Sequence, residues 1–138
     1  ADRSRVLGAP RLRGARGGAQ VPALKSPHSE RVYELRNYES YTDAILQNKI
    51  HMFNQGGEIT LFSRLGFNAV FYAEAITGSN TPNLFYMTSF ENMASREEHW
   101  KTFGESDEWK RLSTMPQYRR NVSRVEIHFL RATPYSGF

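Results

Sequence analysis

A carboxylate and a histidine on predicted strands are the side chains of this sequence best placed for acid–base chemistry. Glu74 stands in an extended apolar segment beside Tyr72, and its pKa would be raised if another protein layer covered that face. A carboxyl of that kind can serve as a general base. The alternative role of Glu74 is structural, as an ion-pair partner of Arg36 or Arg124, and we favour it.

His128 is predicted on the last strand, beside Glu126 or Glu34. It could shuttle protons there, or it could be an ordinary strand residue. The four histidines of the chain are too far apart in the sequence for a known metal-ligand spacing. The chain also has no cysteine, which excludes disulfides, thiolate metal sites and cysteine nucleophiles. The sequence therefore predicts no metal and no cofactor, and it leaves the catalytic residues unassigned.

The positive charge of the chain is concentrated at its N-terminal end. The 138 residues carry a net charge of +4, and residues 1–30 hold all of it, with six cations against two anions. Those residues are rich in Gly, Ala, Arg and Pro and lack apolar periodicity, which predicts a disordered basic tail or linker before a domain over residues 31–138. The balanced charge of residues 31–138 argues against nucleic-acid binding.

Composition also bears on the compartment. No apolar run reaches the roughly 18 to 20 residues of a membrane span, so the sequence predicts a soluble protein without a transmembrane segment. The arginine-rich N-terminal end would also fit a mitochondrial targeting segment. Because no amphipathic helix is evident there, we expect a bacterial cytoplasm or periplasm rather than a mitochondrion.

The elements that must position these residues follow the order β-α-β-β-α-β. Alternation and capping signals predict a strand over Arg31–Tyr38, a helix from the N-cap Thr42 to Leu65, strands over Phe67–Thr77 and Leu84–Phe90, a helix between Asn92 and Gly104, a short helix from Ser106, and a strand over Asn121–Arg131. Gly56 and Gly57, inside the first helix, are attributed to close packing. The order predicts an α+β, ferredoxin-like fold, in which helices cover one face of a four-stranded antiparallel sheet.

The sheet face turned away from the helices should be polar in a lone domain. Alternation instead assigns to it a mixture of apolar and charged residues: Val32, Tyr38, Val70, Tyr72, Ile76 and Leu130 with Glu34, Arg36, Glu74, Arg124, Glu126 and His128. This mixture predicts a covered face, in a homodimer or against a second similar domain. Four other side chains are predicted to line a cavity between sheet and helices: Tyr33, Phe71, Phe85 and Met87.

An ordered series of segments resembles the NIPSNAP family over residues 31–136. The segments are VYELRNYES (32–40), KIHMFNQGGEITLFSRLGFNAVFYAEAITG (49–78), LFYMTSFENMASREEHWKTF (84–103), SDEWKRL (106–112) and LRATPYS (130–136). The resemblance implies a dimeric α+β barrel, in which two ferredoxin-like domains pair by their open sheet faces. The chain is most similar to the second domain of bacterial tandem NIPSNAP proteins, so residues 1–30 would be an interdomain linker. The family has no firmly assigned activity, and the resemblance transfers no catalytic residue.

The sequence therefore predicts a dimerising NIPSNAP-type domain that binds a small apolar ligand or a protein partner. The candidate pocket or interface residues are Tyr33, Arg36, Tyr72, Glu74, Tyr86, Trp109 and His128. One alternative is a cofactor-independent oxygenase or isomerase that uses a pocket carboxylate on the same barrel fold. Another is an interaction module whose basic tail contacts an acidic partner or a membrane.

Overall fold

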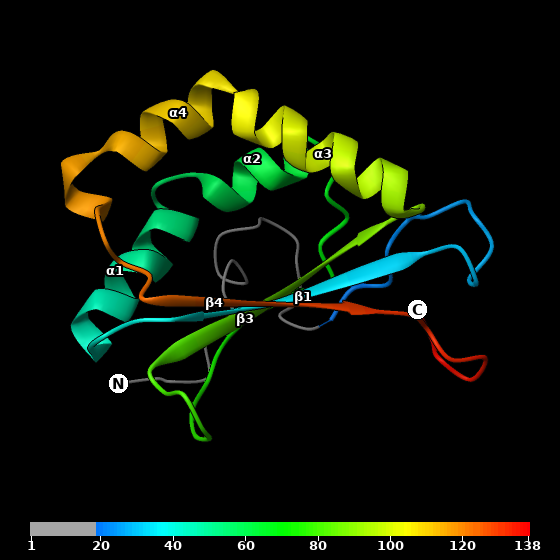
Figure 1. Cartoon of the computed structure of the whole chain (residues 1–138), viewed down its shortest axis with the longest axis horizontal. Coiled ribbons are helices and arrows are strands. Elements are labelled where there is room, and N and C mark those ends of the chain that lie inside the picture. Colours follow the sequence, from blue (N-terminus) through cyan, green and yellow to red (C-terminus); the bar gives the residue numbers. More distant parts are fainter. Residues whose placement is uncertain (1–18) are drawn as a thin grey trace.

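A four-stranded antiparallel sheet lies beneath a layer of helices in the computed structural model, which describes residues 19–138 (Figure 1). The strands stand in the order β2-β3-β1-β4. This arrangement confirms the predicted α+β, ferredoxin-like fold. The elements are β1 (Val32–Glu39), α1 (Asp43–Asn54), α2 (Glu58–Arg64), β2 (Phe71–Glu74), β3 (Asn83–Phe90), α3 (Met93–Glu105), α4 (Asp107–Thr114), the 3₁₀ turn η1 (Pro116–Tyr118) and β4 (Arg124–Leu130).

Three helices begin at the residues whose side chains can cap them. Thr42, Asn92 and Ser106 each accept a hydrogen bond from the backbone N–H three residues on, at 3.2, 2.8 and 3.2 Å. Each bond satisfies one of the free N–H groups of a helix start. The starts of α1, α3 and α4 are therefore confirmed as predicted.

The predicted helix over Thr42–Leu65 is wrong in its middle, because the structure divides it into α1 and α2. Gly57 separates the two with a φ of 91°, in the left-handed region that favours glycine. A Cβ on Gly56 would meet the Met52 carbonyl oxygen at 2.4 Å. The two glycines therefore serve the break between α1 and α2 and a close backbone approach, rather than packing of a continuous helix.

The predicted strand over Phe67–Thr77 is reduced to the four residues of β2. Asn68 has a φ of 44°, and the Val70 N–H donates to the Met87 carbonyl although Phe71 is the register partner of Met87. Two residues thus oppose one, as in a β-bulge. The bulge changes the phase of alternation, so Phe67 and Tyr72 both point into the core while Phe71 faces away from the helices.

The face assignment from the sequence is wrong for β1 and β2 and right for β4. Glu34, Arg36 and Tyr38 of β1 contact helix residues or core aromatics, so they lie on the helix side. Tyr33 and Leu35 lie on the opposite side, which we call the open face. On β4 the open face carries four residues, as predicted: Arg124, Glu126, His128 and Leu130.

The helices pack on the sheet through a continuous set of aromatic side chains. Phe53, Phe62 and Tyr86 are fully buried. The ring centroid of Phe62 lies 4.9 Å from that of Phe103 on α3, and that of Phe53 lies 5.3 Å from that of Tyr86 on β3. Such pairs each add about 0.5–1.5 kcal/mol beyond area burial. The packed aromatics leave the helix side rigid wherever helices cover it.

Residues 19–31 run along the domain without forming a helix or strand. The Gln20 N–H donates to the Val70 carbonyl at 2.8 Å, and the Lys25 and Ser26 N–H groups donate to the Glu91 carboxylate at 2.9 and 2.7 Å. Residues 1–18 of the predicted tail lie outside the described residues, and the division at residue 30 stays a prediction. No helix among residues 19–138 is long and apolar enough to cross a membrane.

Candidate functional site

A fully buried carboxylate joins the sheet to α3 on the helix side. Glu34 accepts hydrogen bonds from Arg36 Nε at 2.5 Å, Arg96 Nε at 2.7 Å and Trp100 Nε1 at 3.0 Å. Burial alone would raise the pKa of Glu34, but the hydrogen bonds of Arg96 and the charge of Arg36 outweigh burial and hold that pKa below its usual value. Glu34 is therefore an ionised carboxylate that holds α3 to β1, and it is a weak base.

Arg36 extends this hydrogen-bond network across the sheet, on the side that the helices cover. Its Nη1 donates to the Tyr38 hydroxyl at 3.1 Å, and the Tyr38 and Tyr86 hydroxyls share a hydrogen bond of 2.7 Å. Burial raises the pKa of Tyr86 well above its ordinary value, and Tyr38 adds to the shift. The guanidinium of Arg36 lies 3.8 Å from the centroid of the Trp100 ring, a stacked cation–π geometry.

A second buried ion pair was missed by sequence reasoning. Lys49 Nζ lies 3.0 Å from Glu58 Oε2, and both side chains are almost completely buried. The pair joins α1 to α2 across the glycine break, and the ammonium lies 4.6 Å from the centroid of the Phe53 ring. The sequence does not predict this pair, because a lysine and a glutamate nine positions apart meet only when the helix is broken between them.

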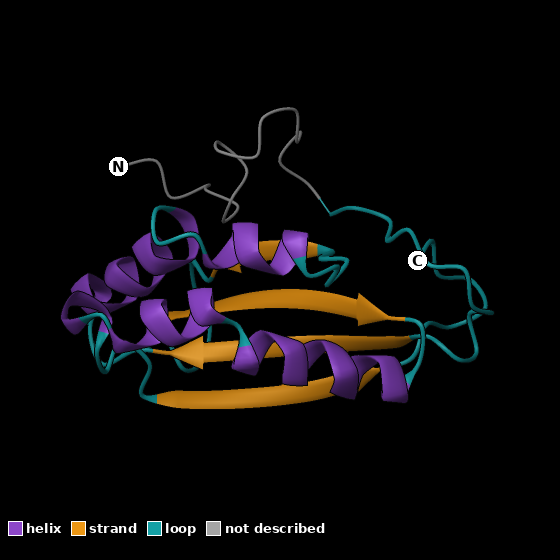
Figure 2. Ribbon diagram, turned by 90° about the horizontal axis from the view of Figure 1, so that it is seen from above, coloured by secondary structure: helices purple, strands orange, loops and turns teal. Residues whose placement is uncertain are grey.

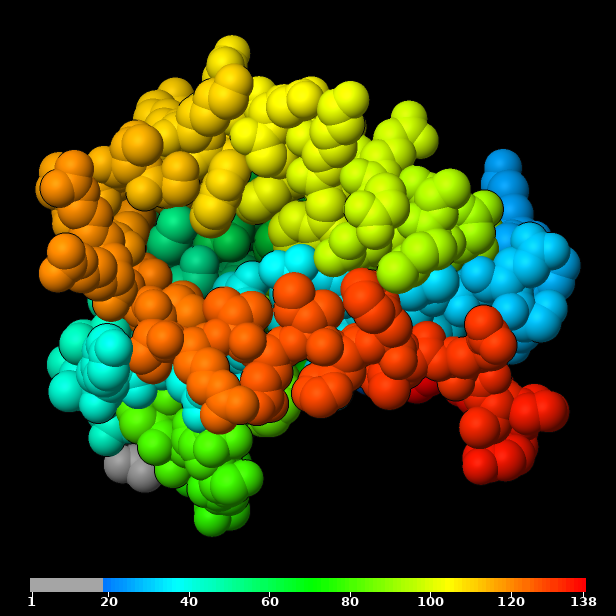
Figure 3. Space-filling model, viewed as in Figure 1, coloured from blue at the N-terminus to red at the C-terminus, as the bar shows by residue number. Residues whose placement is uncertain are grey.

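An open cleft lies between β4 and the helices. From above, β4 runs along the lower margin of the sheet, outside the helices for most of its length (Figure 2). The space-filling view shows the surface hollowed between α3–α4 and β4, with atoms of β1 at the bottom (Figure 3). We call this hollow the β4 cleft. The residues that we assign to it are Arg36, Trp100, Val125, Ile127 and Phe129, from β1, α3 and β4.

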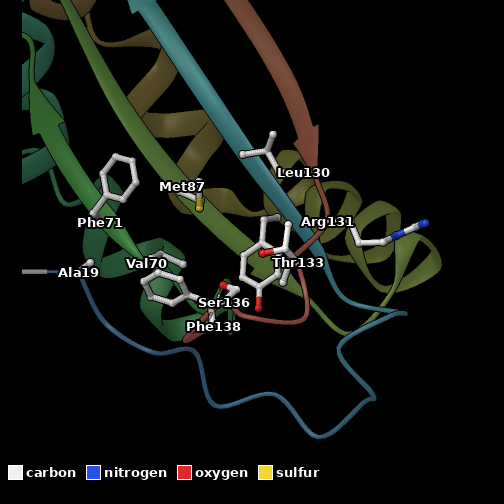
Figure 4. A pocket seen from close by; sticks show the side chains of 11 residues that line it. Ala19, Val70, Phe71, Met87, Leu130, Arg131, Thr133, Ser136 and Phe138 are labelled. Atoms are coloured by element: carbon white, nitrogen blue, oxygen red, sulfur yellow. Dashed lines mark hydrogen bonds between the residues drawn. The ribbon is translucent and has the colours of Figure 1, made fainter.

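A pocket of about 350 Å³ lies on the other side of the sheet, which we call the open-face pocket (Figure 4). Side chains from the sheet form one wall, with Phe71, Met87 and Leu130 on β2, β3 and β4. The segment after β4 returns along the pocket and contributes Phe138. The lining also includes three residues that carry a hydroxyl group, Tyr33, Thr133 and Ser136. The Tyr33 hydroxyl is buried and has no hydrogen-bond partner in the described structure.

The predicted cavity residues do lie near one another, but on the opposite side from the prediction. Tyr33, Phe71 and Met87 line the open-face pocket, whereas a cavity between sheet and helices was expected. Phe85 shares this face through its register with Asn37 and Ala73 but is not among the lining residues. The phase change at the β2 bulge accounts for the inversion of Phe71.

Three predicted site residues occupy the helix side instead of the open face. Tyr72 is buried beneath α1 and α2, where burial raises its pKa and the charge of Glu58 adds to the shift. Tyr86 and Arg36 belong to the buried network described above. Tyr72 and Tyr86 are register partners, so these three residues are neighbours within the core, and the assignment of Tyr72 and Arg36 to an external interface is wrong.

Glu74 does not have the surroundings that an enzymatic role for it requires. It ends β2 opposite Leu84, and its Oε1 accepts a hydrogen bond from Gln47 Nε2 at 2.9 Å, close to solvent. Neither predicted partner, Arg36 or Arg124, contacts Glu74 in the described structure. An enclosed carboxylate is therefore absent at this position.

The last two predicted site residues lie apart from each other. His128 is exposed on the open face, and its Nε2 lies 3.7 Å from Glu126 Oε2. Of the two predicted neighbours of His128, Glu126 and Glu34, the structure therefore places Glu126 beside it. The Trp109 ring centroid lies 4.7 Å from that of Phe103, and the residue packs against the core. Among residues 19–138 no group of three or more acidic or histidine side chains could hold a metal ion.

The fold and its two recesses define a ferredoxin-like α+β domain with an uncovered sheet face. The sequence profile of the NIPSNAP family matches residues 32–137, and the chain therefore belongs to the NIPSNAP family. A comparison with functionally curated proteins finds no match.

Solved structures of the same family are similar to this chain in fold. An uncharacterised NIPSNAP-like domain protein of Burkholderia xenovorans has a TM-score of 0.69 at 14% identity, over 79% of this chain and 90% of that one. A NIPSNAP family protein of unknown function from Agrobacterium tumefaciens has a TM-score of 0.66 at 21% identity, over 81% and 96%. A putative monooxygenase of Lactobacillus acidophilus reaches 0.51 at 13% identity, over 76% and 45%. At these identities the likeness concerns the fold alone.

Proposed function

We propose that this chain is a NIPSNAP domain that holds a small, mainly apolar molecule in the open-face pocket. The pocket itself carries the proposal, because its volume of about 350 Å³ falls within the range of ligand sites, about 300–1,000 Å³. Its lining is predominantly apolar, with Phe71, Met87 and Leu130 from the sheet and Phe138 from the C-terminal segment, which favours an apolar ligand.

Two aromatic residues of the C-terminal segment provide a matched test of the pocket. Phe138 lines the pocket, whereas Tyr135 is exposed outside it. We expect the neutral fluorescent probe N-phenyl-1-naphthylamine to bind the full chain saturably, and Phe138→Ala to weaken binding at least threefold because it removes apolar contact area. Tyr135→Ala should leave the affinity unchanged. Equal affinities of the two variants, or no saturable binding, would contradict the proposal.

The remainder of the open face supports pairing with a second copy or a similar domain. Leu35 and Phe85 lie near the middle of this face, half-buried, with no described helix above them. Burying such groups contributes about 1.5–3 kcal/mol each. We expect light scattering to show a dimer that Phe85→Arg dissociates, while Tyr41→Arg, at an exposed position before α1, does not. A clean monomer would contradict the pairing and leave the pocket proposal standing.

A further inference from the structure

The helix-side surface of β4 is an apolar strip that the helices leave uncovered. Val125, Ile127 and Phe129 point to the helix side because their register partners on β1 are Tyr38, Arg36 and Glu34. Even so, 42–48% of each residue is exposed. A run of large apolar side chains along an exposed edge strand is unusual in a soluble domain, because natural edges are commonly blunted by charge.

A cation lies beside the middle of this strip. Arg36 stands opposite Ile127 in the register. Its Nε is bonded to Glu34 and one Nη1 proton to the Tyr38 hydroxyl, whereas its Nη2 has no hydrogen-bond partner within residues 19–138. The side chain keeps 12% of its surface accessible. Arg36 therefore lies between Trp100 and the apolar strip, and its Nη2 protons remain available as hydrogen-bond donors.

The other charges near the cleft are engaged. Arg96 donates to both oxygens of Glu34 and to Glu97 Oε1, and its guanidinium lies 5.1 Å from the Phe129 ring centroid. Lys49 is paired with Glu58. Of these three cations, Arg36 alone retains a terminal nitrogen without a partner in the described structure. The charge and donor geometry of the cleft floor therefore favour an anionic acceptor at that point.

We propose that the β4 cleft binds an amphipathic monocarboxylate, with the apolar body along Val125, Ile127 and Phe129 and the carboxylate at Arg36. A carboxylate suits the spare donors because a guanidinium presents them as a fork that can engage both oxygens. The Trp100 ring, which stacks on the Arg36 guanidinium, bounds the same hollow on the helix side. This site lies on the opposite face of the sheet from the open-face pocket and does not depend on it.

Trp100 gives this site its own reporter. Its ring centroid lies 3.8 Å from the Arg36 guanidinium, and the chain has one other tryptophan, Trp109, so the intrinsic emission includes a tryptophan at the cleft. The probe is sodium decanoate, titrated into the full chain, with 1-decanol as the uncharged molecule of the same length. We expect decanoate to change the emission saturably and to bind at least tenfold more tightly than decanol.

Substitutions at one exposed position separate charge from apolar contact. Ile127→Glu places a carboxylate next to Arg36 and should weaken decanoate binding at least tenfold. Ile127→Lys removes the same apolar side chain without repelling the ligand and should stay within threefold of the wild type. Ile76→Glu makes the first substitution at another exposed isoleucine and should have no effect. Circular dichroism melting checks that each variant is folded.

Several outcomes would overturn the proposal. Equal affinities for decanoate and decanol, equal losses in Ile127→Glu and Ile127→Lys, or an equal loss in Ile76→Glu would each refute carboxylate recognition at Arg36. If decanoate does not bind and Ile127→Glu converts a dimer into a monomer, the strip is an interface between copies of the chain, and the ligand site is refuted.

Discussion

Replacing Glu34 by glutamine tests how strongly one buried carboxylate holds α3 to the sheet. The side chain of Glu34 is completely buried and accepts hydrogen bonds from Arg36, Arg96 and Trp100. Glutamine keeps the shape but removes the charge and turns an amide NH₂ toward a guanidinium. Removing one partner of a buried ion pair costs about 3–5 kcal/mol. Because Arg36 and Arg96 keep 12% and 15% of their side-chain surface accessible, we expect about 3 kcal/mol.

Urea unfolding followed by circular dichroism measures this loss of unfolding free energy. Glu126→Gln is the matched control, because Glu126 is partly exposed and pairs with the well-exposed Arg124, and such a surface pair contributes at most about 1 kcal/mol. A loss in Glu34→Gln below about 1 kcal/mol, or no larger than that of Glu126→Gln, would refute the view that the buried network fixes α3 on β1.

The stability difference between the wild type and Glu34→Gln should depend on pH. The pKa of Glu34 in the folded chain lies below the ordinary glutamate value of about 4.5, so the ionised carboxylate favours folding fully above about pH 4.5. That contribution is lost as the pH falls below 4.5. The stability difference between the wild type and Glu34→Gln should therefore shrink in acid, and a difference that grows toward low pH would contradict the pKa direction.

Two further predictions concern the glycine break and the segment before β1. Gly57→Ala should lower the unfolding free energy by about 1 kcal/mol, because the φ of Gly57 is 91°. The control Gly104→Ala lies in α3 with open space around the position, so it should not destabilise the domain. Equal changes of the unfolding free energy in the two variants would contradict the role of the positive φ. Hydrogen bonds from Ser26 and from the Lys25 N–H lower the pKa of Glu91 to about 2. Hydrogen exchange of the Lys25 amide, corrected for the intrinsic rate, should therefore accelerate as the pH falls from 4.5 toward 2. The variant Glu91→Gln should show fast exchange of this amide at neutral pH. A Lys25 amide that stays protected in that variant would contradict the claim that the Glu91 carboxylate holds this segment.

Local signals in the sequence were sufficient for the element order and the helix starts. The capping roles of Thr42, Asn92 and Ser106 depend on an N–H only three residues away, so nothing distant can override them. The sequence does not predict the break at Gly57, because a glycine within an apolar arc is compatible both with close packing and with a helix break. The geometry that decides between them is the positive φ.

The two sides of β1 could not be assigned from alternation. Alternation groups Glu34 and Arg36 with Val32 and Tyr38 and predicts all four on the face turned away from the helices. The burial of Glu34 depends on Arg96 and Trp100, more than 60 positions later in the chain, which satisfy the carboxylate beneath the helix layer. The same error affects the candidate site, because Arg36 and Tyr72 are predicted on the open face. The open-face pocket also includes Phe138, which lies after the last strand.

The two proposed binding regions can be tested separately because consecutive residues of β4 serve opposite faces. Phe129 belongs to the apolar strip of the β4 cleft, and Leu130 lines the open-face pocket. Both are partly exposed on an edge strand, so a charge at either position is less disruptive than one in the core. Phe129→Glu should weaken decanoate binding and leave the naphthylamine probe unaffected, whereas Leu130→Glu should do the reverse. If either variant lowers both affinities alike, the two ligands share one site or the strand has lost its structure, and the assignment of separate sites on the two faces fails.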